Sequence, residues 1–397
     1  MNYSDRIAAE HRHFNETTRV HDLPGIYHYW SGKYILPKLR AFGIEGAPEM
    51  FEACLTRHCE RPGADQRRFV SIGAGNCELE VNLARQLLKK GHPNFVIECL
   101  ELNPAMLERG RALAREAEVD GRLAFVETDM NQWRAERAYD VVLASQSLHH
   151  VQNLEGLFAQ VRGALPPGGQ FAVSDMIGRN GHMRWPEALP IVEQFWRELP
   201  PPYRYNQALQ RHEEVFDNWD CSTEGFEGIR AQDIMPLLLE RFHFEFFVAF
   251  GNVIVPFVDR AFGHNFDAAR DWDREFIDRV HRRDEQEMLA GRVKPTIMVA
   301  ILGADSSIAT QYLAPFSPSF CVRWPEGERT EIASPNPWLE NRERKRQMEE
   351  TESRWRGEIS PLNARLQTAE WQIAQAASSR WVRLGRRFGL GPKLRVP

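Results

Sequence analysis

The sequence predicts an α/β protein built on a doubly wound, mostly parallel sheet. Short apolar runs of strand length alternate with segments whose apolar residues recur at helical spacing. A turn with two glycines follows the first of these runs, at residues 73–75, and polar or acidic residues follow the ends of the later runs. Ligands of such folds bind at the carboxyl ends of the strands, so we expect the functional site at that edge.

The first strand and its turn are the most informative part of the chain. Residues 69–72 are apolar enough for a buried strand, which meets Gly73 and Gly75 before a helix that begins near Leu79. Such a turn brings backbone N–H groups and the positive end of a helix close to a ligand. Side chains would block that approach, so glycine is needed. The turn predicts a nucleotide-like cofactor.

Two acidic residues follow the second and third strands. Glu101 ends the second strand, where a carboxylate can accept hydrogen bonds from both ribose hydroxyls of an adenosine ligand. Asp129 is placed to accept from an exocyclic amine, with Met130 against the ring. Asn103 and Pro104 fit the N-cap and first turn of the next helix. The later strands are expected at 94–101, 122–127, 139–144, 170–174, 242–250 and 296–302.

From about Arg67 to Gly303 these residues resemble the class I S-adenosylmethionine-dependent methyltransferases. The motifs that carry the resemblance are the glycine turn, Glu101, the pair Asp129-Met130, the segment Ser145 to His150 and the turn Pro166-Pro167-Gly168-Gly169. The resemblance implies a Rossmann-like sheet of about seven strands with an antiparallel last strand, and S-adenosylmethionine as cofactor. It implies these cofactor-binding residues: Ser71, Gly73, Ala74, Gly75, Asn76, Glu101, Leu102, Asp129, Met130, Ser145 and Gln146.

Two positions depart from the family pattern. Ser71 stands where many members carry Asp or Glu, and Cys77 replaces the usual third glycine. The first change weakens an indirect contact to the methionine amine, and the second indicates a wider turn. A nicotinamide-binding Rossmann protein is the main rival, but its fingerprint needs that third glycine. A catalytically inactive scaffold with the same fold is the other alternative.

The amino-acid composition limits the classes of protein to which the chain can belong. The chain has 397 residues, 43% hydrophobic and 26% charged, which is typical of globular proteins with more than one domain. A net charge of −5 argues against general nucleic-acid binding. Six scattered cysteines without a Cys-x-x-Cys pattern fit a reducing cytoplasm. We find no secretion signal and no apolar run long enough to span a bilayer.

Three regions are added to the core at 67–303. Residues 1–66 are expected to form a helical cap over the cofactor, or a solvated helical segment. The insertion 178–229 lies at the edge that builds acceptor pockets in such folds. Its candidate acceptor-binding residues are Tyr203, Arg204, Tyr205 and His182. Residues 304–397 are expected to be a linker and a C-terminal helical tail.

The tail carries two patterns. Apolar residues recur at heptad spacing, at Met348, Trp355, Leu362, Ala369 and Ala376. This coiled-coil-like seam either packs back on the same molecule or forms a homodimer. The segment from Arg380 to the end is basic, with apolar residues between the charges. It is either a solvated tail or a reversible contact with the inner, anionic face of a membrane.

The sequence therefore predicts a methyltransferase, with O-methylation of a small-molecule or glycan-type acceptor in a bacterial-type biosynthetic pathway. A hydroxyl acceptor needs a base, and His149 and His150 follow the strand that borders the methyl site. His150 is slightly favoured of the two. Asp175, at the tip of the fifth strand, would orient the histidine or bind the acceptor. No metal site is expected, because no set of clustered carboxylates is visible in the sequence.

Overall fold

The protein is described from a computed structural model that covers residues 2–16, 22–63, 66–223 and 225–323. These residues belong to one compact unit, Met1–Arg329. The predicted heptad seam and the basic C-terminal segment lie outside the described residues.

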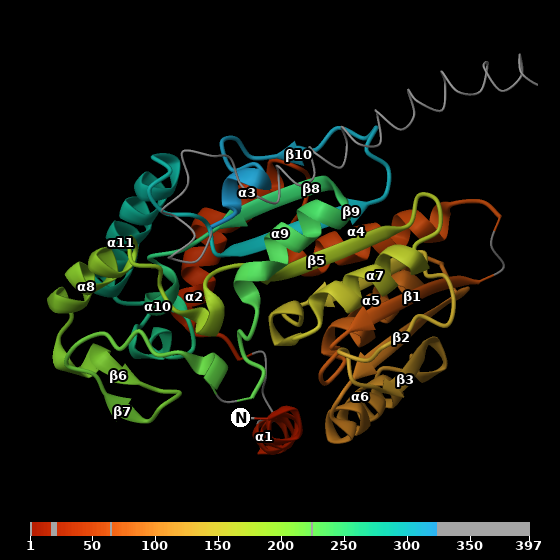
Figure 1. Cartoon of the computed structure of the whole chain (residues 1–397), viewed down its shortest axis with the longest axis horizontal. Coiled ribbons are helices and arrows are strands. Elements are labelled where there is room, and N and C mark those ends of the chain that lie inside the picture. The colour runs from red at the N-terminus through yellow and green to blue at the C-terminus, as the bar shows by residue number, and fades with distance from the viewer. Residues whose placement is uncertain (1, 17–21, 64–65, 224, 324–397) are drawn as a thin grey trace, which may run out of the picture. The chain divides into compact units, whose positions relative to one another are not determined.

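One eight-stranded sheet organises the fold (Figure 1). Its strands are β1 (Arg67–Ile72), β2 (Phe95–Glu101), β3 (Leu123–Glu127), β4 (Val141–Ser145), β5 (Gln170–Met176), β8 (His243–Phe250), β9 (Ile297–Gly303) and β10 (Gln311–Tyr312). They lie in the order β10–β8–β9–β5–β4–β1–β2–β3. Strand β9 is antiparallel to both β5 and β8, and the other pairings are parallel. The doubly wound sheet with an antiparallel closing strand is confirmed, and β10 adds one short strand to the expected seven.

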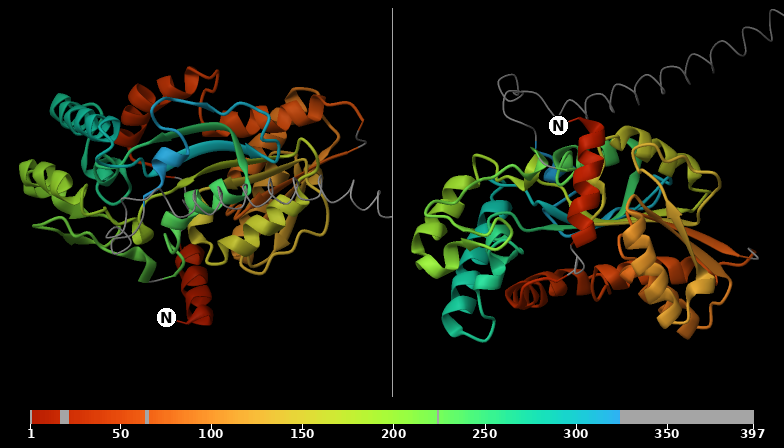
Figure 2. Two further views of the ribbon diagram at one scale, coloured as in Figure 1. Left: turned by 45° about the horizontal axis from the view of Figure 1, so that its top comes forward. Right: turned by 90° about the horizontal axis from the view of Figure 1, so that it is seen from below.

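Helices cover both faces of this sheet (Figures 1 and 2). Helices α4 (Ala47–Glu60), α5 (Glu78–Lys89) and α6 (Pro104–Glu116) pack side by side on one face. Helices α7 (Leu154–Ala164) and α9 (Ala231–Arg241) pack together on the other. Phe69, Val70 and Ile72 of β1 are fully buried, because this central strand is covered on both faces. That explains its unbroken apolar sequence.

The start of α6 forms as the sequence predicts. Asn103 is the N-cap, and its side chain accepts a hydrogen bond from the backbone N–H of Ala105 at 2.9 Å. Pro104 occupies the first helical turn, where its missing N–H costs nothing. This cap fixes the direction in which the chain leaves β2, and therefore the position of Glu101 just before it.

A second group of elements lies beside the sheet. It contains the helices α8 (Leu189–Glu198), α10 (Val255–Val258) and α11 (Asp271–Leu289), and a hairpin of β6 (Tyr205–Asn206) and β7 (Arg211–His212). Helix α2 (Gly25–Trp30), a π-helical turn (Ser31–Ile35) and α3 (Leu36–Arg40) complete it. Short 3₁₀ turns lie at Asp120–Arg122, Leu148–His150, Asn180–His182, Pro201–Arg204, Cys221–Thr223, Gly263–Asn265 and Ser319–Cys321.

The aromatic residues of the N-terminal region anchor it to α11. Tyr29 and Tyr34 donate hydrogen bonds to the carboxylate of Asp278 at 3.0 and 2.8 Å. Trp30 Nε1 donates to His281 Nδ1 at 3.2 Å, with both side chains buried. Residues 25–40 are therefore packed against α11, whereas the preceding helix α1 (Tyr3–Glu16) reaches Asp129, which follows β3.

Within the ranges that the structure describes, none of the helices has the length and apolar character that crossing a bilayer requires.

Candidate active site

The glycine turn lies at the point where the strand order reverses, between β2 on one side of β1 and β4 on the other. Gly73 and Gly75 have φ angles of 64° and 56°, in the left-handed region that favours glycine. A Cβ on Gly73 would lie 2.7 Å from Cβ of Ser147, which follows β4. Two separate features therefore require glycine at position 73: its positive φ angle, and the close contact between its loop and the loop of Ser147.

Glu101 lies directly against the glycine turn. Its carboxylate accepts hydrogen bonds from the backbone N–H of Gly75 at 3.0 Å and of Asn103 at 2.9 Å. Burial raises the pKa of Glu101 above its ordinary value. The backbone of Ala74 donates to the carbonyl of Leu100 at 2.9 Å, and Leu102 is half-buried beyond the strand tip. The glycine turn and the end of β2 are thus joined by hydrogen bonds through Glu101 and Leu100.

Asp129 takes part in a local network after β3. Its carboxylate accepts from the backbone N–H of Asn131 at 2.9 Å and from the hydroxyl of Tyr3, on α1, at 2.5 Å. Met130 beside it is half-buried. The expected role of Asp129 and Met130 toward an adenine ring stays a prediction. The contact with Tyr3 shows that α1 extends across this end of the cradle.

Ser71 departs from the family pattern and is paired with another carboxylate. Its hydroxyl donates to Glu80 Oε1, on α5, at 2.5 Å, and both side chains are buried. Burial raises the pKa of Glu80 to about 7. A buried carboxylate from the first turn of α5 thus lies beside Ser71, the position at which many family members carry an acid. The sequence analysis did not identify Glu80.

Cys77, the second departure, is accommodated by a glycine of the neighbouring helix. Cys77 is the N-cap of α5, with a left-handed φ of 58°. A Cβ on Gly110, in α6, would lie 2.8 Å from the sulfur of Cys77. Asn76 before it is buried, and its Oδ1 accepts from Nε of Arg109 at 2.8 Å. The side chain of Cys77, which replaces the third glycine, therefore occupies the space that the absence of a side chain on Gly110 leaves beside α6.

The segment after β4 places a histidine against an aspartate of β5. Ser145 ends β4, and Gln146 has a left-handed φ of 53°, so the chain turns sharply before Leu148–His150. His149 Nδ1 lies 2.6 Å from Asp175 Oδ1. Asp175 is fully buried and its Oδ2 accepts from the backbone N–H groups of Ser147 and Leu148 at 3.0 and 2.7 Å. The aspartate therefore holds both the ring and its loop.

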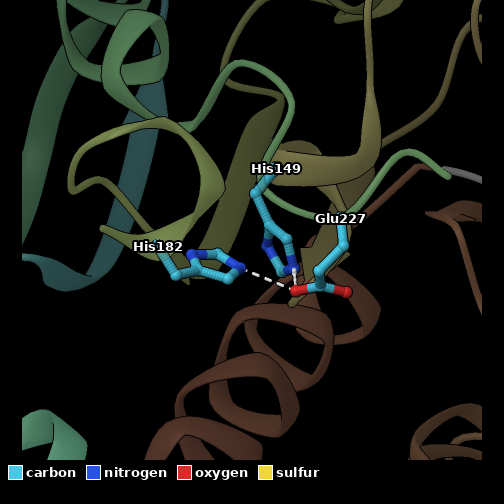
Figure 3. Close-up of side chains that lie close together, drawn as sticks. All are labelled: His149, His182 and Glu227. Carbon is cyan, nitrogen blue, oxygen red and sulfur yellow. Dashed lines mark hydrogen bonds and ion pairs between the residues drawn. The ribbon is translucent and has the colours of Figure 1, made fainter. Parts of the chain in front are cut away.

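The other side of His149 faces a carboxylate from the insertion (Figure 3). Its Nε2 lies 3.4 Å from Glu227 Oε1, and His182 Nε2 lies 2.6 Å from the same oxygen. His150 Nε2 lies 3.3 Å from Glu227 Oε2. These four residues, His149, His150, His182 and Glu227, are called the histidine–glutamate cluster below.

The cluster favours positive charge. Burial opposes the charged form of His149, but the carboxylates of Asp175 and Glu227 outweigh burial and raise its pKa to about 10. Burial also opposes the charged form of Glu227, but the three neighbouring histidines hold its pKa well below the ordinary value. The two carboxylates therefore stabilise the charged form of the His149 ring.

Two glycines bring His182 and Glu227 together. The backbone N–H of Gly181 donates to the carbonyl of Gly228 at 2.9 Å, and a Cβ on Gly228 would lie 3.1 Å from that nitrogen. His182 itself has a left-handed φ of 54°. Such conformations persist where the surroundings enforce them, and they gather at functional sites. This hydrogen bond thus holds the loop of His182 against the loop of Glu227, directly beside the cluster.

Helix α1 connects the cofactor edge with the cluster. Glu10 Oε1 lies 3.2 Å from His150 Nδ1, and Glu10 Oε2 accepts from the backbone N–H of Phe226 at 3.3 Å. At the cofactor side, Arg109 donates to the carbonyl of Phe14 at 2.9 Å. The helix lies where a cap over a bound cofactor is expected, although residues 17–21 after it are not described.

The other candidates in the insertion make different contacts. Tyr203 donates to Asp273 at 2.7 Å, Arg204 Nε donates to the carbonyl of Leu199 at 2.9 Å, and Tyr205 donates to Gln210 at 3.2 Å. The first two contacts tie the turn before the hairpin β6–β7 to α11 and to the C-cap of α8, and the third lies within the hairpin. Of the expected acceptor residues, the structure brings His182 to the catalytic candidates; the role of the other three stays a prediction.

Comparisons with known proteins agree with the geometry of the cradle. Residues 69–169 match the family model of a methyltransferase domain, which covers the glycine turn, Glu101, Asp129 and the two adjacent histidines. Curated relatives include 27-O-demethylrifamycin SV methyltransferase of Amycolatopsis mediterranei, 29% identical over 28% of this chain and 39% of that protein. Sterol 24-C-methyltransferase of Debaryomyces hansenii is 33% identical over 20% of this chain and 21% of that protein. The chain thus spans less than half the length of these relatives.

Solved structures with a similar chain path include the O-methyltransferase of a trans-AT polyketide synthase multienzyme of Brevibacillus brevis, in complex with S-adenosyl-L-homocysteine. It is 12% identical, with a TM-score of 0.38, over 73% of this chain and 82% of that one. Together, the matched domain, the strand order and the cradle identify the type of this domain. The chain contains a methyltransferase domain, matched at residues 69–169, whose strand order is that of the class I S-adenosylmethionine-dependent type.

Proposed function

We propose that this protein transfers the methyl group of S-adenosylmethionine to a hydroxyl oxygen of a small-molecule or glycan-type acceptor. One observation carries the choice of oxygen: the buried pair of His149 and Asp175 lies beside the glycine turn, and its outer face meets His182 and Glu227. The contact of Gly73 with Ser147 joins the cofactor cradle to the loop that carries this pair.

The chemistry explains why this cluster suits an oxygen acceptor. The acceptor oxygen attacks the methyl carbon, the carbon–sulfur bond breaks, and sulfur keeps the electron pair as neutral S-adenosylhomocysteine. The hydroxyl proton must leave in the same step, because a neutral alcohol is a weak nucleophile. An imidazole of the cluster can take up that proton after it has released its own proton to solvent, which the raised pKa of His149 makes a required earlier step. A neutral amine acceptor has no such requirement before the attack.

The second candidate is a scaffold that keeps the fold without transferring methyl groups. The buried Asp175 argues against it, because its carboxylate is committed to orienting one imidazole and its loop. In a scaffold without activity, there would be no functional reason to hold Nε2 of His149 toward the carboxylate of Glu227.

Product analysis tests the proposal. The full chain is incubated with carbon-13 methyl-labelled S-adenosylmethionine and fractionated extract, and the products are analysed by mass spectrometry and NMR. We expect a labelled product whose methyl carbon has the chemical shift of a methyl ether or ester. A methyl group on nitrogen or carbon would contradict the oxygen assignment. Formation of no labelled product with bound cofactor would favour the scaffold.

A further inference from the structure

We propose that His149, His182 and Glu227 bind one divalent transition-metal ion. Each residue offers one ligand atom, and the three atoms lie within 4.8 Å of one another (Figure 3). The ligands come from the loop after β4, the turn Asn180–His182 and the segment before Gly228, so the fold assembles a site that no local motif shows.

The hydrogen bond to Asp175 supports a ligand role for His149. A metal-binding histidine uses one ring nitrogen for the ion and usually donates the other N–H to a carboxylate or carbonyl. Here Nδ1 is held by Asp175 Oδ1 at 2.6 Å, which directs Nε2 toward Glu227. Asp175 is itself fixed by two backbone N–H groups. The orienting carboxylate is therefore already in place.

The other two ligands are positioned as firmly. The hydrogen bond between Gly181 and Gly228 holds their loops together at 2.9 Å. His150 faces the second oxygen of Glu227 at 3.3 Å, which turns the first oxygen toward His149 and His182. Because neither loop must be ordered by the ion, binding carries a smaller entropic cost than in a flexible loop.

The distances fit an ion after a small adjustment. Ligand atoms around a tetrahedral ion with bonds of about 2.1 Å lie roughly 3.4 Å apart. His149 Nε2 and Glu227 Oε1 are separated by 3.4 Å, whereas His182 Nε2 and that oxygen, at 2.6 Å, must move apart. Rotation of the His182 ring or of the Glu227 carboxylate lengthens this distance, and the three ligand atoms already lie within 4.8 Å of one another.

Ligand chemistry and exposure indicate the kind of ion. Two imidazoles and one carboxylate suit Zn²⁺, Fe²⁺, Mn²⁺ or Co²⁺, whereas Mg²⁺ and Ca²⁺ prefer oxygen ligands. The side chain of His149 is 5% exposed, that of His182 20% and that of Glu227 43%. The cluster is thus closed on the side of the sheet and open beyond Glu227. Catalytic metal sites keep such an open position for water or substrate.

The role of the ion, though not its binding, rests on the proposed function. An acceptor hydroxyl that occupies the open position loses its proton more readily, because the ion stabilises the alkoxide. The proton passes to solvent, the oxygen attacks the methyl carbon, and S-adenosylhomocysteine leaves.

Metal binding by the full chain tests the proposal without any methyl acceptor. Protein stripped with a chelator is titrated with Zn²⁺ and with Co²⁺, and followed by calorimetry, by metal analysis after desalting and by the visible spectrum of Co²⁺. We expect one ion per chain. His182→Ala and Glu227→Gln should each lower the affinity at least tenfold. His212→Ala, which removes an exposed histidine of β7, should leave it unchanged. Circular dichroism checks that each variant is folded.

The outcomes separate this site from the proposed function. Binding that is weak, of variable stoichiometry or equal in all variants would overturn the metal site, since it would report adventitious ions on surface histidines. A calorimetric titration with S-adenosylmethionine in chelator is run in parallel. Cofactor binding without metal binding refutes the metal site alone. Metal binding without cofactor binding refutes the proposed function and leaves the site standing.

Discussion

His149 and Asp175 come from neighbouring strand ends and form one rigid unit: the carboxylate holds the ring at Nδ1 and accepts two backbone N–H groups of the loop that carries that ring. The pair lies beside the glycine turn, because Gly73 packs directly on Ser147 of the same loop. The glycine turn and the pair of His149 and Asp175 are therefore joined by one loop.

Replacing Asp175 with asparagine should slow methyl transfer more than it weakens cofactor binding. The amide can no longer accept from the ring and from two backbone N–H groups at once, so His149 loses its fixed orientation. We expect kcat to fall about 10²- to 10⁴-fold, the range associated with a positioned acid–base group, with KM for S-adenosylmethionine nearly unchanged.

Asp140→Asn is the matched control for that variant. Asp140 accepts from the backbone N–H of Arg68 at 3.0 Å, at the opposite edge of the sheet. The Asp140→Asn variant should lose about as much free energy of unfolding as Asp175→Asn, and it should keep its methyltransferase activity. Equal kinetic losses in both variants would mean that Asp175 is only structural.

Glu101→Gln should weaken the binding of S-adenosylmethionine about 10- to 100-fold, because hydrogen bonds to a charged group contribute about 1.5–3 kcal/mol. Isothermal titration measures this directly. Glu108→Gln serves as the control, since Glu108 lies on α6 with its side chain 63% exposed and contacts only arginines of its own helix in the described structure. Unchanged affinity in Glu101→Gln would contradict the ribose assignment.

Gly73→Ala and Gly91→Ala separate backbone strain from the loop contact. Both glycines have positive φ, 64° and 82°, so alanine costs about 1–2 kcal/mol at either site. Nothing lies within 4 Å of a Cβ on Gly91, whereas a Cβ on Gly73 meets Ser147 at 2.7 Å. Urea unfolding should show a larger loss for Gly73→Ala, and only that variant should lose cofactor affinity. Equal losses would show that the loops do not touch.

The buried histidines away from the site should make stability depend on pH. Burial lowers the pKa of His281 from 6.5 to about 4, and Trp30, which can only donate, requires an unprotonated Nδ1. Burial, followed by the charge of Arg61, likewise lowers the pKa of His58 to about 4.

In both cases the unfolded chain takes up the proton first. Stability is therefore fully present above pH 6.5 and falls as the pH is lowered toward 4. Urea titrations near pH 7 and pH 5 measure this. His281→Asn keeps an acceptor for Trp30 and should lose less stability between those values than the wild type. The same slope in both proteins would show that His281 is protonated in the folded state.

The sequence was sufficient for the sheet and for the turn and helix cap that follow its first two strands, because these depend on local patterns. Apolar runs, two glycines and the Asn103–Pro104 cap are short-range signals, and Glu101 lies against Gly75 as the family pattern implies. Glu227 carries no such signal. Its place beside His149 depends on the backbone contact between Gly181 and Gly228, which only the folded chain reveals.

The two histidines show the same limit. Adjacent residues in a turn point in different directions, and the sequence alone slightly favoured His150. In the structure the hydrogen bond with Asp175 is made by His149, while His150 lies between Glu10 and Glu227. The register between β4 and β5 decides this, because it places Ser145 opposite Ser174 and so sets Asp175 against the following loop.

The most direct test of the account is a crystal structure of the full chain with S-adenosylhomocysteine. We predict that the ribose lies on Glu101, the amino acid part over Gly73 and Gly75, and the sulfur on the side of His149. A ligand bound elsewhere, or a glycine turn filled by side chains of the protein itself, would contradict it.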